Sequence, residues 1–183
     1  MLEIGTATRV YLRKVRASDR RELVERVAEG ASLLSPWISA PSTPRAFRHY
    51  LRRTQRDDHE GLLVCRLDTD AIIGVINLNN IVRGSFLSAS LGYYAMARHA
   101  GQGYMQEGLE LVKDYAFRQL GLHRIEANIQ PNNKRSINLV KRCGFVREGY
   151  SRDFLHIEGA WRDHERWAAI DSRKALTVTP MFR

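Results

Sequence analysis

The sequence has 183 residues, 44% of them hydrophobic, and a formal net charge of +9 at pH 7. That length can bury one substantial core, and no Pro/Ser/Gly-rich linker divides the chain, so we expect a single domain over residues 1–183. The positive charge favours an anionic partner such as RNA, a nucleotide cofactor or an acidic protein surface, without choosing among them.

The composition also argues against several classes of protein. There is no apolar signal core at the N-terminus, and no run approaches the ~20 apolar residues of a membrane span. We therefore expect a soluble, cytoplasmic protein that does not bind a membrane. Cys65 and Cys143 form no Cys-x-x-Cys pair, so we expect no disulfide framework and no metal site, and both cysteines should be small buried residues.

The first half of the chain mixes strand and helix signals. Residues 9–15 alternate as a half-buried strand does, and Ser18-Asp19 can cap a helix over 20–28. Three prolines in 33–44 predict a loop or short helix that holds Trp37 near the surface. The other predicted elements of this half are a helix over 44–56, an antiparallel hairpin over 62–67 and 72–78, and a strand over 86–96.

The second half contains the clearest helix. Apolar residues after Gly103 recur at three- and four-residue steps until Gly121, which is typical of one buried helical face. A strand over 123–129, a short helix over 136–142 and closing strands over 145–157 and 161–170 follow. Together these elements predict a mixed α/β (α+β) fold with a largely antiparallel central sheet flanked by helices.

The junction between the strand over 86–96 and this helix is suited to hold a phosphate. Gly101 and Gly103 let the main chain turn tightly, and a helix start offers unpaired N–H groups and a partial positive charge. A dinucleotide fingerprint would need a third glycine where Gln106 stands, and the Gly-Lys-Ser/Thr of a P-loop is absent. Arg98-x-x-Gly101-x-Gly103 instead resembles the acyl-CoA pyrophosphate loop of the GNAT acetyltransferase superfamily.

A second motif follows in the order that this superfamily has. The strand over 122–128, the helix start Asn133-x-x-Ser136 and the turn Gly144-Phe145 are similar to its strand, Asn-x-x-Ser helix and Gly-Phe turn. Residues 80–86, 91–93, 149–153 and 161–164 closely resemble the RimJ/RimL type of ribosomal-protein-alanine N-acetyltransferase. The likeness runs roughly from residue 9 to 170.

The resemblance implies a cofactor site for acetyl-CoA. The strand before Gly101 would splay from the strand that contains Glu126 and leave a V-shaped gap for the pantetheine arm, whose amides would bond the backbone of Tyr93, Tyr94 and Ala95. The further residues implied to bind coenzyme A are Arg98, Gly101, Gln102, Gly103, Tyr104, Met105, Gln106, Asn133, Ser136 and Asn138.

The reaction requires an uncharged amine to attack the thioester. With pKa values of about 8 for an α-amine and about 10.4 for lysine, about a tenth of α-amines but only a few in ten thousand lysines are neutral at pH 7. A chain terminus is therefore the easier nucleophile. The resemblance assigns proton removal to Glu126, the alternative being a carboxylate simply paired with Arg124 or another cation.

The thiolate that leaves must be protonated. Relatives of the RimI kind use a tyrosine where this chain has Val140, so the resemblance assigns this step to Ser136. The alternative is a helix-start serine that only satisfies backbone N–H groups. A backbone N–H near Tyr94 or Ala95 would stabilise the oxyanion of the tetrahedral intermediate.

Contacts with the acceptor are expected from residues that are polar or amphipathic and lie on strands and loops. Asp163 would suit an incoming ammonium, although each of these residues could instead be structural. They are Trp37, Asn77, Asn79, Tyr150 and Asp163. The arginine-rich run 45–56 is interpreted as an exposed helix face, with docking on a ribosomal surface or RNA as the alternative.

The predicted function is direct transfer, in a ternary complex, of an acetyl group from acetyl-CoA to the α-amine of a protein N-terminus. The expected acceptor is Ala or Ser of a ribosomal protein, and the enzyme is expected to be a monomer or homodimer. Two alternatives stay open. One is a small-amine acetyltransferase for an amino sugar, antibiotic or polyamine, and the other is a basic ribosome- or RNA-associated factor that binds acetyl-CoA without turnover.

Overall fold

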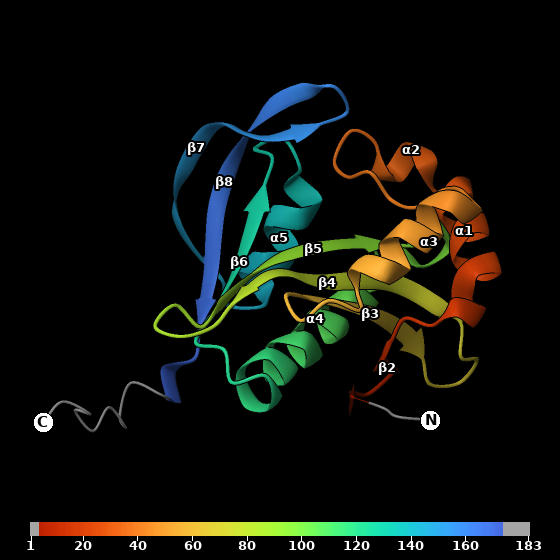
Figure 1. Ribbon diagram of the computed structural model, residues 1–183, viewed down its shortest axis with the longest axis horizontal. Coiled ribbons are helices and arrows are strands. Elements are labelled where there is room, and N and C mark those ends of the chain that lie inside the picture. Colours follow the sequence, from red (N-terminus) through yellow and green to blue (C-terminus); the bar gives the residue numbers. More distant parts are fainter. Residues whose placement is uncertain (1–3, 174–183) are drawn as a thin grey trace, which may run out of the picture.

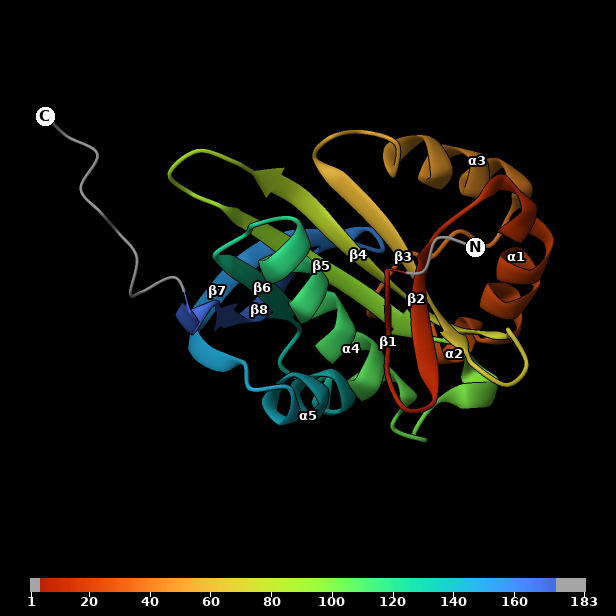
Figure 2. The ribbon, with the colours of Figure 1, turned by 90° about the horizontal axis from the view of Figure 1, so that it is seen from below.

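The computed structural model describes residues 4–173, which form an eight-stranded sheet in the order β1-β2-β3-β4-β5-β6-β8-β7 with helices on both faces (Figures 1 and 2). The strands are β1 (Gly5–Thr6), β2 (Val10–Lys14), β3 (His59–Arg66), β4 (Ile72–Val82), β5 (Ser88–Ala95), β6 (Arg124–Ile129), β7 (Val146–Ile157) and β8 (Ala160–Ile170). The helices are α1 (Arg20–Glu29), α2 (Ala31–Leu34), α3 (Pro44–Arg53), α4 (Tyr104–Asp114) and α5 (Lys134–Arg142).

The pairing of the strands follows from their connections. Neighbouring strands pair antiparallel except β5 and β6, which pair parallel. A parallel pair needs a crossover, and α4 supplies it between these two strands (Figure 1). The prediction of a mixed, largely antiparallel sheet flanked by helices is confirmed.

Side chains alternate between two faces of the sheet, and each face has its own helices. On the face that we call the α4/α5 face, Leu109 of α4 and Val140 of α5 are fully buried. On the opposite face, the α1/α3 face, Leu23 of α1 and Phe47 of α3 are buried. Burying each of these large apolar side chains contributes about 1.5–3 kcal/mol, which explains why the periodic apolar residues locate the helices correctly.

The ends of the predicted elements differ in several places. The helix expected over 44–56 ends at Arg53, and the short helix expected from 136 begins at Lys134. A π-helical turn, η3 (Tyr115–Gln119), continues α4 toward Gly121. Strand β1 was not predicted, since its two residues are too few to show a period.

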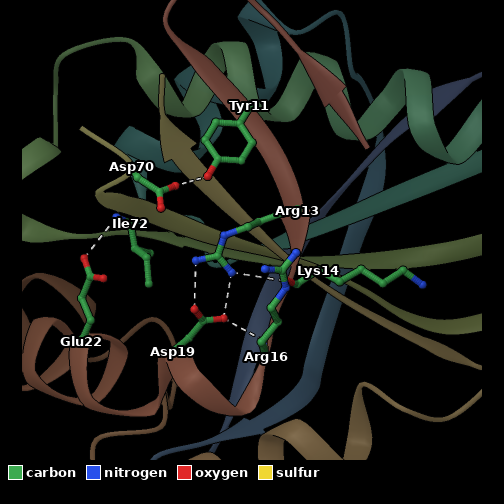
Figure 3. Close-up of polar contacts among 8 residues, drawn as sticks. All are labelled: Tyr11, Arg13, Lys14, Arg16, Asp19, Glu22, Asp70 and Ile72. Carbon is green, nitrogen blue, oxygen red and sulfur yellow. Dashed lines mark hydrogen bonds and ion pairs between the residues drawn. The ribbon is translucent and has the colours of Figure 1, made fainter. Parts of the chain in front are cut away.

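The expected capping role of Asp19 is wrong. Its carboxylate makes no hydrogen bond to the first turn of α1. It accepts instead from both terminal nitrogens of Arg13, each at 2.9 Å, and from the backbone N–H of Arg16 at 2.7 Å (Figure 3). Both side chains of this ion pair are about 8% exposed, so Asp19 joins β2 to the start of α1 from within the core.

Two expectations about composition can be compared with the structure. Cys65 and Cys143 are both buried and carry free thiols, as predicted. In residues 4–173 no helix combines the length and the apolar character that crossing a membrane requires.

Replacing Arg13 by methionine should destabilise the fold by about 3–5 kcal/mol, because it leaves the Asp19 carboxylate buried without its partner. Chemical denaturation monitored by circular dichroism measures this change. The double variant Arg13→Met/Asp19→Leu removes both charges and should recover most of the lost stability. Equal stabilities of the single variant and the wild type would contradict a buried ion pair at this position.

Candidate functional site

The loop before α4 presents unpaired main-chain donors. Gly101 and Gly103 have φ angles of 78° and 83°, a left-handed conformation that residues with a Cβ rarely adopt. The start of α4 has no side-chain cap. Within residues 4–173, no acceptor receives a backbone N–H from residues 101–105. Such a group of donors at a helix start has the geometry of an anion-binding loop.

Arg9 fastens the first turn of α4 from the loop between β1 and β2. Its terminal nitrogen donates to the carbonyl oxygen of Gln102 at 3.2 Å, and its Nε donates to Glu107 at 2.6 Å. The same guanidinium lies 4.5 Å from the ring centroid of Tyr104. Arg9 thereby neutralises the one carboxylate in the first turn of α4, which would otherwise repel an anion at the loop.

Arg98 faces a different partner from the one expected. Its guanidinium makes two hydrogen bonds to Glu29 at the end of α1, at 2.8 and 3.0 Å. Desolvation raises the pKa of Glu29, but the hydrogen bonds and charges of Arg26 and Arg98 together outweigh it, so the pKa is lowered and this carboxylate stays charged. Arg98 is therefore beside the loop but engaged with α1.

Strands β5 and β6 part beside this loop. They pair over four positions, from Ser88 with Arg124 to Leu91 with Ala127, and then diverge (Figure 1). Beyond that point, β5 pairs only with β4 through residues 92–95, and β6 pairs only with β8 through Asn128 and Ile129. The backbone edges of Tyr93, Tyr94 and Ala95 therefore face the opening between the two strands.

Helix α5 borders the same opening. Asn133 caps it, because its side-chain oxygen accepts from the backbone N–H of Ser136 at 3.1 Å. The capping duty considered for Ser136 thus falls to Asn133. The Ser136 side chain is partly buried and hydrogen-bonds with the hydroxyl of Tyr93. Asn138 is an exposed residue of α5.

Tyr93 connects β5 to α5 across the opening. Its hydroxyl donates to the carbonyl oxygen of Ser136 at 3.4 Å. Burial raises its pKa well above the usual value, so the phenol keeps its proton at neutral pH. The sequence predicts a role only for the backbone of Tyr93. The contact of its hydroxyl with α5 was not predicted, because the two residues lie 43 positions apart in the sequence.

Polar side chains form a row on the α1/α3 face where the strands part. The register aligns Asn79 of β4 with Ser90 of β5, and Ser90 with Glu126 of β6. Asn77 lies two residues from Asn79 on the same face and is held by the hydroxyl of Tyr50, at 2.8 Å from its oxygen. The expected residues Asn77, Asn79 and Glu126 are therefore neighbours on one face.

Asn128 extends this row to the opening and was missed in the sequence. It follows the last residue of β6 that pairs with β5, and it shares the face of Glu126. Its Oδ1 is buried and has no hydrogen-bond partner in the described residues 4–173. An orphan buried acceptor is costly unless a ligand supplies a donor. No local signal identifies Asn128, because its importance depends on where the pairing ends.

Glu126 is held by two arginines. Its oxygens accept from Nε of Arg124 at 2.7 Å and from a terminal nitrogen of Arg166 at 3.4 Å. Arg124 also pairs with Glu148 on β7. The ion pair with Arg124, expected as the alternative role of Glu126, is present.

Tyr150 and Asp163 lie away from this row. Strand alternation puts Asp163 on the face of Trp167, which belongs to the core of the α4/α5 face. Asp163 accepts from the Tyr150 hydroxyl at 2.6 Å and from the N–H of Asp153 at 2.9 Å. These two bonds lower the pKa of Asp163. They also link β7 to β8 at the bulge of β7, and the expected contact of these two residues with the acceptor stays a prediction.

His164, the next residue along β8, lies on the opposite face from Asp163, which is the face of the polar row. His164 is 2% exposed, and its Nδ1 lies 2.8 Å from the carbonyl oxygen of Arg162. Burial lowers the pKa of His164, which makes the neutral imidazole the form at pH 7. Its ring packs edge-on against Phe154, with centroids 5.9 Å apart.

The loop that contains Trp37 bridges to the far end of the sheet. The carbonyl oxygen of Pro36 accepts from the side chain of Gln130 at 3.2 Å, just after β6. Ser35 donates to Glu158 at the β7–β8 turn, at 3.1 Å. Trp37 itself is half-buried. This loop therefore crosses from α2 toward the end of β6, above the face that carries the polar row.

Comparison with known families agrees with this arrangement. The model of the acetyltransferase (GNAT) domain matches residues 9–146 of the chain. The [ribosomal protein uS5]-alanine N-acetyltransferase of Escherichia coli is 36% identical over 167 residues, which cover 87% of this chain and 86% of that protein. The spermidine N(1)-acetyltransferase of Vibrio cholerae is 23% identical over 163 residues, covering 87% and 93%.

Solved structures share the fold. RimJ of Mycobacterium smegmatis in complex with CoA-disulfide superposes with a TM-score of 0.82 at 22% sequence identity, over 97% of this chain and 93% of that chain. At this level of identity the likeness concerns the fold.

Proposed function

The chain belongs to the GNAT acetyltransferase family, and we propose that it transfers the acetyl group of acetyl-CoA to the N-terminal α-amine of a ribosomal protein, at alanine or serine. One observation carries this proposal: the opening between β5 and β6 lies between the anion-binding loop and the polar row. The 36% identity with a ribosomal-protein-alanine N-acetyltransferase supports a protein acceptor. Such an acceptor places the reaction in the cytoplasm.

The cofactor would use main-chain groups that the fold leaves unpaired. The N–H groups of residues 101–105 would bind the pyrophosphate of acetyl-CoA. The pantetheine arm would then enter the opening and pair with residues 93–95 of β5, as an added strand pairs with a sheet edge. Arg98 reaches the pyrophosphate only by leaving Glu29, whereas Asn133 and Asn138 approach from α5.

The acceptor would enter from the α1/α3 face. There the free Oδ1 of Asn128 accepts a hydrogen bond from the incoming amine. Glu126 takes the proton of the attacking nitrogen, directly or through water. Asn77, Asn79 and Trp37 border the acceptor chain. A backbone N–H near Tyr94 or Ala95 stabilises the oxyanion.

Transfer is direct and leaves no acetylated enzyme. The amine nitrogen forms a bond to the acetyl carbon, and the bond between that carbon and the sulfur breaks. The nitrogen gives one proton to Glu126, and the sulfur receives one from the Ser136 hydroxyl. The proton on Glu126 then returns through water to the Ser136 oxygen, which restores both residues. Tyr93, protonated and bonded to the carbonyl of Ser136, is a second donor close to this step.

The acceptor class can be tested by mass spectrometry. Purified protein is incubated with acetyl-CoA and a library of peptides that differ in the first residue, with spermidine in a parallel reaction. We expect acetylation of the α-amine of Ala- and Ser-initiated peptides, and little on internal lysines, because few lysine side chains are neutral at pH 7. Exclusive acetylation of spermidine would overturn the protein acceptor while keeping the cofactor site.

The loop assignment can be tested by calorimetric titration with coenzyme A. Gly101→Ala should weaken binding by tenfold or more, about 1.4 kcal/mol, because the loop must leave its left-handed conformation. Gly84→Ala is the matched control. Gly84 also has a positive φ, 69°, and like Gly101 has no atom within 4 Å of an added Cβ, but it lies in the β4–β5 turn. Equal losses in both variants would reject the loop as the binding site.

The two proton-transfer roles predict different kinetics. Ser136→Ala should lower kcat about 100-fold with KM for acetyl-CoA nearly unchanged, and Asn133 should keep α5 capped. Glu126→Gln should lower kcat most at low pH, where the amine is mostly protonated, and less as pH rises through the amine pKa of about 8. Unchanged kcat in the first variant, or an unchanged pH profile in the second, removes that residue from the mechanism.

A further inference from the structure

The outer surfaces of α1 and α3 carry exposed arginines that lack acidic partners. Within residues 4–173 none of them forms an ion pair with a carboxylate. We call this set the arginine surface: Arg16 just before the turn η1 (Ala17–Asp19), Arg20 and Arg21 at the start of α1, and Arg45, Arg48, Arg52 and Arg53 on α3. Most of the other arginines in residues 4–173 do have a carboxylate partner, as Arg9, Arg66 and Arg118 do.

Several of these charges work against the helices that carry them, although Arg52 and Arg53 lie in the last turn of α3, where the helix end favours cations. Helix α3 contains no Asp or Glu, and Arg48 and Arg52 stand four residues apart, where like charges destabilise a helix. Arg20 and Arg21 begin α1, where the partial positive charge of the helix start disfavours cations. A bound polyanion would remove both penalties.

The two helices form one continuous surface. Leu23 of α1 and Phe47 of α3 belong to the same buried cluster, so α1 and α3 lie side by side on the sheet (Figure 1). Burial raises the pKa of Tyr50, and the charges of Arg53 and Asp19 also act on this pKa. Both charges are therefore near Tyr50, so the end of α3 lies beside the start of α1.

We propose that the arginine surface docks onto the phosphate backbone of RNA. Guanidinium groups match phosphate oxygens with two parallel hydrogen bonds, and interfaces with nucleic acid are polar and strongly positive. An acidic protein partner fits less well, because protein interfaces have an apolar centre. The exposed large hydrophobic residues of the described chain lie on the strands and their turns, outside α1 and α3.

The position of this surface also suits the proposed acceptor. Helices α1 and α3 cover the face that carries Asn77 and Asn79, the side from which the amine would enter. RNA held there would bring a protein of the same ribonucleoprotein particle to the opening. The RNA interaction itself does not depend on acetyl transfer, and it is measured without acetyl-CoA.

The test is the fluorescence anisotropy of a labelled short RNA hairpin, titrated with protein at several salt concentrations. The triple variant Arg45→Gln/Arg48→Gln/Arg52→Gln should bind about tenfold more weakly or worse, and the slope of log affinity against log salt should fall by about two. The control Arg83→Gln/Arg142→Gln/Arg152→Gln removes the same charge from exposed arginines outside the surface, and its affinity should change less than about threefold.

Three results would overturn the proposal. Equal losses in the two triple variants would indicate attraction by net charge alone. Binding of polyglutamate as tight as that of RNA would indicate an acidic protein surface as the partner. Photocrosslinks from thiouridine-substituted RNA to wild-type protein that fall outside α1 and α3 would place the RNA elsewhere, and this third measurement does not depend on a variant that folds.

Discussion

The early end of the β5–β6 pairing is the constraint on which the rest of this structure depends. Four residue pairs join the two parts of the sheet, and beyond Leu91 and Ala127 each strand keeps a partner on one side only. Main-chain groups that cannot pair internally must find water or a ligand. The loop before α4 offers unpaired donors in the same way, so the fold itself provides an extended site before any side chain takes part.

Local patterns in the sequence were sufficient for the elements but not for their partners. The apolar period after Gly103 located α4, because it reflects burial on one side. The closing strands expected over 145–157 and 161–170 correspond to β7 and β8. Asp19 shows the limit. Its side chain had two compatible uses, a helix cap or an ion pair, and only the packing of β2 against η1 (Ala17–Asp19) brings Arg13 close enough to decide.

The parts of the candidate site that depend on local backbone conformation could be predicted from the sequence. The parts that depend on how the strands pair with one another were harder to predict. Gly101 and Gly103 predict a tight turn, and both residues adopt the left-handed conformation. In contrast, Asp163 and His164 are adjacent in sequence and face opposite sides of β8. Tyr150 pairs in register with Glu165, which shares the face of Asp163, so it bonds Asp163 and not His164. Asn128 matters only because the pairing stops one residue earlier, which no sequence window contains.

The contact between Arg9 and the first turn of α4 has a practical consequence for handling the protein. Arg9 lies in the short connection between β1 and β2, at the outer edge of the sheet, yet it bonds Gln102 and Glu107 beside the anion-binding loop. An affinity tag or trimming that displaces this edge would disturb the loop from a distance, and weak cofactor binding measured on such a protein would reflect the altered terminus rather than the native enzyme.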